Sequence, residues 1–143
     1  MFYTREYLEF AADAGNMKAQ LLLGQQYLTG EGDVDKDGKK AFELFSKAAN
    51  SGNSYARYCL GFLYAHGLGV EKDLQRAIKC YEIAADQGDA DTELNLGLMY
   101  LAGEGMAKDE GKAFELIKRP AEHGKADAQF TVAVMYQQRS GTC

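Results

Sequence analysis

A repeat of about 36 residues runs along the chain and limits the folds that the chain can adopt. Three short blocks return in the same order: Ala-Ala-x-x-Gly, then Leu-Gly-x-x-Tyr, then Gly-x-Gly followed by an aspartate. The first block ends at Gly15, Gly52, Gly88 and Gly124, and the second ends at Tyr27, Tyr64, Tyr100 and Tyr136. Units of this length cannot bury an apolar face alone, so each must stack on its neighbours.

Each repeat is predicted to form two helices. Ala77, Ile78, Tyr81 and Ala84 recur at helical spacing, which places them on one apolar face. Asp73 precedes this helix as an N-cap, and a glycine that reaches the left-handed conformation ends it. The eight predicted helices cover roughly residues 2–14, 16–29, 37–51, 53–66, 73–87, 89–102, 109–123 and 125–138.

The sequence therefore predicts an all-α fold, an α/α solenoid of about four helix pairs. We expect a single domain over residues 1–143, with repeat units near 1–36, 37–72, 73–108 and 109–143. The glycine of the second block lies inside an apolar helical stripe, where it costs about 1 kcal/mol relative to alanine. A close crossing of two helix backbones is therefore expected at Gly24, Gly61 and Gly97. The tyrosines of the same block are expected in the core, with their hydroxyls bonded to the backbone.

The three blocks resemble the Sel-one-like repeat family, a relative of the tetratricopeptide repeat, over nearly the whole chain. The last repeat departs from the pattern. Pro120 replaces an alanine, Lys125 a capping residue, Ala133 the helical glycine and Arg139 the first loop glycine. Pro120 is expected to kink its helix, because proline lacks a backbone donor. The resemblance implies a right-handed superhelix whose Leu-Gly-x-x-Tyr helices line a concave face.

The resemblance further implies that a protein or peptide partner binds this concave face. An adaptor or scaffold-type binder is the function expected. The residues that the resemblance places on the face are Lys18, Tyr55, Tyr58, Phe62, His66, Asp91, Leu94, Leu98 and Phe130. An aromatic and aliphatic centre with a charged edge is the composition of a protein interface.

The composition excludes several other partners. The net charge is -5 and the lysines are scattered among acids, so no basic stripe can follow a nucleic acid. No apolar run approaches the roughly 18 residues that span a bilayer, and no membrane insertion is expected. The three cysteines are odd in number and far apart, which fits free thiols in a reducing compartment. The chain as given is predicted to be cytoplasmic; a periplasmic or secreted location is the alternative if a signal peptide has been removed.

No set of residues indicates catalysis, and no cofactor is expected. His66 and His123, the only histidines, lie far apart in the sequence and lack a third partner. The Ser-x-x-Lys and Lys-Thr-Gly sequences that accompany β-lactam chemistry do not occur. Three functions are therefore weighed. A protein-interaction module is favoured over an immunity or inhibitor protein for a secreted toxin, and over a β-lactam-binding protein or hydrolase.

One loop has the beginning of a calcium site. Asp33, Asp35, Asp37 and Gly38 spell Asp-x-Asp-x-Asp-Gly, the first half of a calcium loop. Leu44 stands at the twelfth position, where the bidentate glutamate is expected. A solvated acidic loop is therefore favoured over a weak calcium site.

The first predicted helix is crowded with aromatic residues. Phe2, Tyr3 and Tyr7 lie on a helix that no earlier repeat covers in this sequence. Two roles are open for them: a contact between two copies in a homodimer, and a docking surface for a partner.

Overall fold

The computed structural model describes residues 5–32 and 35–141, and within them the chain forms eight α-helices and no strand. The all-α solenoid prediction is confirmed. The helices are α1 (Arg5–Asp13), α2 (Met17–Thr29), α3 (Gly38–Asn50), α4 (Ser54–His66), α5 (Leu74–Asp86), α6 (Ala90–Ala102), α7 (Glu110–Glu122) and α8 (Ala126–Gly141). In this part of the chain no helix is both long and apolar enough to cross a membrane.

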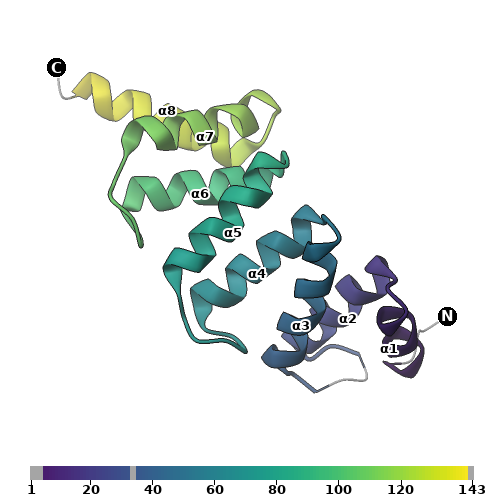
Figure 1. Cartoon of the computed structure of the whole chain (residues 1–143). Helices are drawn as coiled ribbons and strands as arrows, with labels where there is room; N and C mark the ends of the chain where they lie inside the picture. The colour runs from purple at the N-terminus through teal and green to yellow at the C-terminus, as the bar shows by residue number, and fades with distance from the viewer. Residues whose placement is uncertain (1–4, 33–34, 142–143) are drawn as a thin grey trace. The chain divides into compact units, whose positions relative to one another are not determined.

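The chain divides into two compact units, Met1–Cys80 and Tyr81–Cys143, and helix α5 belongs partly to each. In the first unit, α1 packs on α2, α2 on α3 and α3 on α4 (Figure 1). In the second unit, α6 packs on α7 and α7 on α8. The prediction of a single domain concerns folding as one unit, which this division does not test, and it stays a prediction.

The predicted caps set the helix boundaries. Asn16, Asn53 and Asp89 each accept a hydrogen bond from the backbone N–H three residues on, at 2.9, 2.8 and 3.0 Å. Asp37, Asp73 and Asp109 do the same for α3, α5 and α7. The second helix of a repeat ends at a left-handed glycine, Gly30, Gly67 or Gly103.

The last repeat differs from the others where the sequence does. Pro120 is buried inside α7, and the helix continues beyond it to Glu122, so the proline does not end the helix. Arg139 occupies the position at which α2, α4 and α6 end in glycine, and α8 continues through it to Gly141. The departure at Arg139 therefore lengthens the helix and removes the turn.

The glycines inside α2 and α6 allow a close approach of the next helix, which includes the backbone of that helix at Gly97 and only a side chain at Gly24. A Cβ atom at Gly24 would lie 3.0 Å from the ring of Phe45 in α3. A Cβ atom at Gly97 would lie 2.4 Å from Cγ1 of Ile117 and 3.2 Å from the carbonyl oxygen of Ala113, both in α7. The main neighbour of each glycine is thus a large side chain from the next helix.

In three of the four repeats a side chain of the second helix donates a hydrogen bond to a backbone carbonyl eight residues earlier. The donor and acceptor pairs are Gln20 with Ala12, Arg57 with Ala49 and Gln129 with Ala121, at 3.1, 3.4 and 3.1 Å. The equivalent residue of α6 is Glu93, whose side chain is only 8% exposed and cannot donate when ionised. Burial raises the pKa of Glu93, and Arg119, with Nη2 at 3.2 Å from Oε1, opposes this rise. Oε1 nevertheless has no hydrogen bond.

Replacing Gly97 by alanine should destabilise the second unit by about 1–3 kcal/mol, because the added methyl group overlaps Ile117. Urea unfolding followed by circular dichroism measures the loss. The matched control is Gly111→Ala in α7, where the nearest atom to a new Cβ is Oδ1 of Asp109 at 3.5 Å. This control should be neutral or gain up to about 1 kcal/mol from helix propensity. Equal effects of the two substitutions would contradict the packing argument.

Glu93→Gln should raise the free energy of unfolding by about 1 kcal/mol at neutral pH, since glutamine supplies the donor that the other repeats have. An acid whose pKa is raised by folding costs stability above its folded pKa, and the cost declines as the pH falls through that value. The gain from Glu93→Gln should therefore shrink on acidification.

Urea titrations at neutral and acidic pH test this prediction on Glu93. Glu115→Gln, at an exposed site of the same unit, is the control and should change little. A loss of stability in Glu93→Gln at neutral pH would show that the pair with Arg119 outweighs the burial cost.

Candidate functional site

Four aromatic side chains follow one line along α4. Tyr55, Tyr58, Phe62 and His66 are spaced by three, four and four residues, which places them on one face of the helix. We name them the aromatic stripe. Tyr55 and His66 are exposed, while Tyr58 and Phe62 are half-buried. At 1.5 Å per residue the stripe is about 16 Å long.

The rings of the aromatic stripe are held in place by their neighbours. The ring centroids of Tyr55 and Tyr58 lie 6.3 Å apart at 33°, and those of Phe62 and His66 lie 4.2 Å apart at 31°. Nδ1 of His66 lies 3.0 Å from the carbonyl oxygen of Phe62. Gln25 of α2 donates a hydrogen bond from Nε2 to the hydroxyl of Tyr55. Helices α2 and α4 therefore meet at the stripe, and its side chains lose little further freedom on binding.

Helix α2 adds two exposed side chains. Lys18, a predicted site residue, is exposed near its start. Leu22 is also exposed, although it is not one of the predicted site residues. Leu22 is the middle residue of Leu21-Leu22-Leu23, and in such a run helical spacing turns one leucine away from the core.

The second unit holds the other predicted site residues. Leu98 of α6 is 40% exposed and Phe130 of α8 is 72% exposed, so both are available at the surface. Asp91 is exposed and forms an ion pair with Lys125. Leu94 is only 6% exposed, which contradicts its predicted place on a binding face. Leucine is shorter than the tyrosine at the equivalent position 58, and it ends inside the helix packing.

A continuous face that joins the aromatic stripe to Leu98 and Phe130 stays a prediction, because the two units are described separately.

Two tyrosines of the second block, Tyr27 and Tyr100, bond to side chains, so the prediction that their hydroxyls bond to the backbone is wrong. The hydroxyl of Tyr27 donates to Oε1 of Glu9 at 2.8 Å, and that of Tyr100 lies 3.5 Å from Oε1 of Glu82. Burial, together with this bond to Glu9, raises the pKa of Tyr27 to about 12. Each carboxylate belongs to the helix before the tyrosine, because in this packing the ring tip points between helices.

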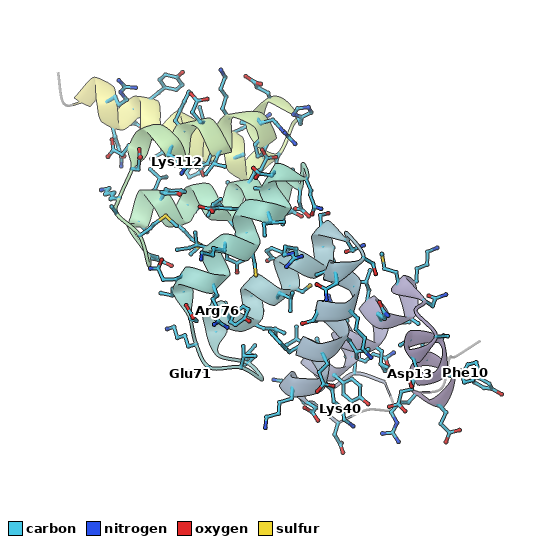
Figure 2. All side chains as sticks on the ribbon, viewed as in Figure 1. Phe10, Asp13, Lys40, Glu71, Arg76 and Lys112 are labelled. Carbon is cyan, nitrogen blue, oxygen red and sulfur yellow. The ribbon has the colours of Figure 1, made fainter. Side chains whose placement is uncertain are left out.

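A basic side chain from the following helix covers each of three tyrosine rings. The pairs are Lys40 on Tyr27, Arg76 on Tyr64 and Lys112 on Tyr100, at 5.2, 5.8 and 4.9 Å from the ring centroid. Figure 2 labels the three basic residues on α3, α5 and α7. This is a cation–π arrangement, and neighbouring tyrosine raises the pKa of both Arg76 and Lys112.

Tyr136 has no such cover among the described residues. It is 57% exposed, so the prediction that it lies in the core is wrong. Its ring packs edge-on against Phe114 of α7, with centroids 5.7 Å apart. The position within the repeat is the same as that of Tyr27, and the burial of Tyr27 comes from the helix that follows it.

Two residues of the calcium-like loop, Asp37 and Gly38, have structural roles that account for their presence. The carboxylate of Asp37 accepts hydrogen bonds from the backbone N–H groups of Lys39 and Lys40, at 3.1 and 3.2 Å. A Cβ atom at Gly38 would lie 2.7 Å from the backbone nitrogen of Gly69, so only glycine fits there. Asp35 is exposed, and Asp33 lies outside the described residues. No group of three potential metal ligands occurs in the part of the chain that the structure covers.

The aromatic residues of α1 are partly described. Tyr7 and Phe10 are exposed, and Phe10 projects away from the ribbon (Figure 2). Phe2 and Tyr3 lie outside the described residues. The homodimer contact through this helix stays a prediction.

Comparisons with known proteins agree with this architecture. The family model of the Sel1 repeat matches residues 4–16, 18–53, 54–89 and 90–125. The crystal structure of c5321, a protective antigen of uropathogenic Escherichia coli with an SLR fold, superposes with a TM-score of 0.87 at 32% identity. It matches 93% of this chain and 28% of its own.

Two further proteins are similar. A Sel1 repeat protein from Oxalobacter formigenes superposes with a TM-score of 0.85 at 35% identity, over 96% of this chain and 57% of its own. The rat protein named DAP3-binding cell death enhancer 1 is 42% identical over 64 residues, which are 45% of this chain and 12% of the rat protein. The chain thus spans only a small part of this curated relative.

Proposed function

The chain belongs to the Sel1 repeat family, and we propose that it is a protein-interaction module whose aromatic stripe binds a polypeptide partner. Sel1 and related repeat proteins are generally protein-interaction modules, and such scaffolds are generally non-catalytic. The name of the rat relative describes it as binding another protein.

The observation that carries the proposal is the aromatic stripe itself. Tyr55, Tyr58, Phe62 and His66 lie side by side on one helix face, and two of the four are exposed. Tyrosine and phenylalanine offer a large contact area with few rotatable bonds, which is why they dominate binding energy at interfaces. The contact between Gln25 and Tyr55 fixes one end of the stripe before any partner arrives.

The chemistry of the stripe indicates the kind of partner. Phe62, packed against the imidazole of His66, forms an aromatic end, while the Tyr55 hydroxyl, Gln25 and Lys18 form a more polar end. A polypeptide segment with apolar side chains followed by an acceptor or a carboxylate would complement both ends. We extend the binding surface to Leu98, Phe130 and Asp91 of the second unit, on the concave face expected of such repeats.

Phe62→Ser should reduce partner recovery at least about tenfold in affinity capture from the source cells, since it removes a central aromatic contact. Leu98→Ser should reduce recovery as well. Its matched control is Ile83→Ser, an apolar residue of similar exposure, 44% against 40%, on a helix outside the proposed surface. Ile83→Ser should leave recovery unchanged.

Circular dichroism and thermal melting of each variant separate binding from folding. Loss of helicity in Phe62→Ser would mean that Phe62 is a core residue and that its assignment to the surface is wrong. Tyr55→Ser, at an exposed position, then tests the stripe by itself. Full partner recovery by folded Tyr55→Ser and Phe62→Ser variants would refute the proposal.

A further inference from the structure

The described residues leave a groove open on the last two helices. The groove has a volume of about 820 Å³ and lies between the end of α6 and helices α7 and α8. Leu101, Phe114 and Tyr136 give it an apolar floor, the exposed acids Glu110 and Glu115 line its α7 side, and the exposed Arg139 lines its α8 side. We name it the α7–α8 groove. It shares no residue with the aromatic stripe.

The ring pair in this groove has a counterpart two repeats earlier. Phe114 and Tyr136 meet edge-on, with centroids 5.7 Å apart at 85°. Phe42 and Tyr64 meet in the same way, at 5.5 Å and 86°. The two ring pairs are therefore the same structural element. The contacts that cover the Phe42–Tyr64 pair show how the Phe114–Tyr136 pair can be covered.

The earlier pair is covered by the chain that follows it. Leu68 and Val70 of the next loop pack against the core of the first unit. Beyond the loop, Arg76 of α5 extends over the ring of Tyr64, with its guanidinium 5.8 Å from the ring centroid. In this setting Tyr64 is half-buried.

At the later pair the chain does not turn in this way. Helix α4 ends at Gly67, which takes the left-handed conformation. Arg139 occupies the equivalent position in α8, and the helix continues to Gly141. No described residue therefore takes the place of Leu68, Val70 or Arg76 over Tyr136.

The covering side chain is basic in every repeat where it is seen. Lys40, Arg76 and Lys112 each stand three residues after the capping aspartate of their helix and cover the preceding tyrosine. Glu110 and Glu115 line the groove together with one cation, Arg139, so the charged side chains of the lining are negative in sum, which favours a further cation beside Tyr136. In a second copy of this chain, the residue equivalent to Lys40 is Tyr3, which has no charge to offer.

We propose that the α7–α8 groove binds a segment of a partner polypeptide in which apolar residues precede a helix bearing a lysine or arginine. The apolar residues fill the groove over Leu101 and Phe114, and the cation lies over Tyr136 between the ring and the two acids. The partner thereby occupies the position that the loop and following helix occupy in earlier repeats.

The test uses the chain's own covering segment as the probe. A fluorescently labelled peptide of residues 68–86, which contains Leu68, Val70 and Arg76, is titrated with the full chain and followed by anisotropy. We expect saturable binding that weakens at least about tenfold in Tyr136→Ser and in the double variant Glu110→Lys, Glu115→Lys. All three residues are exposed, so these variants should fold.

Two controls separate this groove from the proposed function. An Arg76→Glu version of the peptide should bind at least about tenfold more weakly. Tyr55→Ser in the aromatic stripe should leave peptide binding unchanged, so this inference and the proposed function can fail independently. Absence of binding, or equal binding by Tyr136→Ser, would overturn the inference. Sedimentation that shows a dimer abolished by Tyr136→Ser would also overturn it, in favour of a second copy as the occupant.

Discussion

The contact between the second helix of one repeat and the first helix of the next determines much of this structure. Near the middle of that second helix a glycine lets a large side chain of the next helix approach the backbone, as Phe45 does at Gly24 and Ile117 at Gly97. Near its end a tyrosine ring lies under a basic side chain of the same neighbour. The two contacts lie three residues apart on the second helix and five residues apart on its neighbour, so together they restrict both the distance and the rotation between the helices.

This packing leaves the opposite side of the second helix free for other contacts. In α4 the residues buried in the core are Ala56, Cys59, Leu60 and Leu63. The aromatic stripe lies on a neighbouring, partly exposed face of the same helix. Residues that hold the repeats together and residues available to a partner therefore differ along one helix. A change in the stripe can alter binding without removing the contacts on which the repeat depends.

Two departures from the repeat pattern coincide with local differences between the repeats in structure. At Arg139 the loss of a turn glycine extends α8 and leaves the Phe114–Tyr136 pair beside an open groove. At Glu93 an acid replaces a donor, and its buried oxygen lacks a hydrogen bond. The first departure opens a surface, whereas the second buries a carboxylate that pairs with Arg119 and is expected to cost stability.

The sequence by itself determined the helices, their caps and the turns, because these depend on spacing within about 20 residues. Asp37, Asp73 and Asp109 cap helices as the pattern predicts, and glycines end them. It also determined which face of α4 carries aromatic side chains. Only the tertiary structure decided that Tyr27 bonds to Glu9, that Leu94 is buried and that Tyr136 is exposed. Identical positions in a repeat acquire different burial when the helix packed on them differs, and a local pattern does not contain that neighbour.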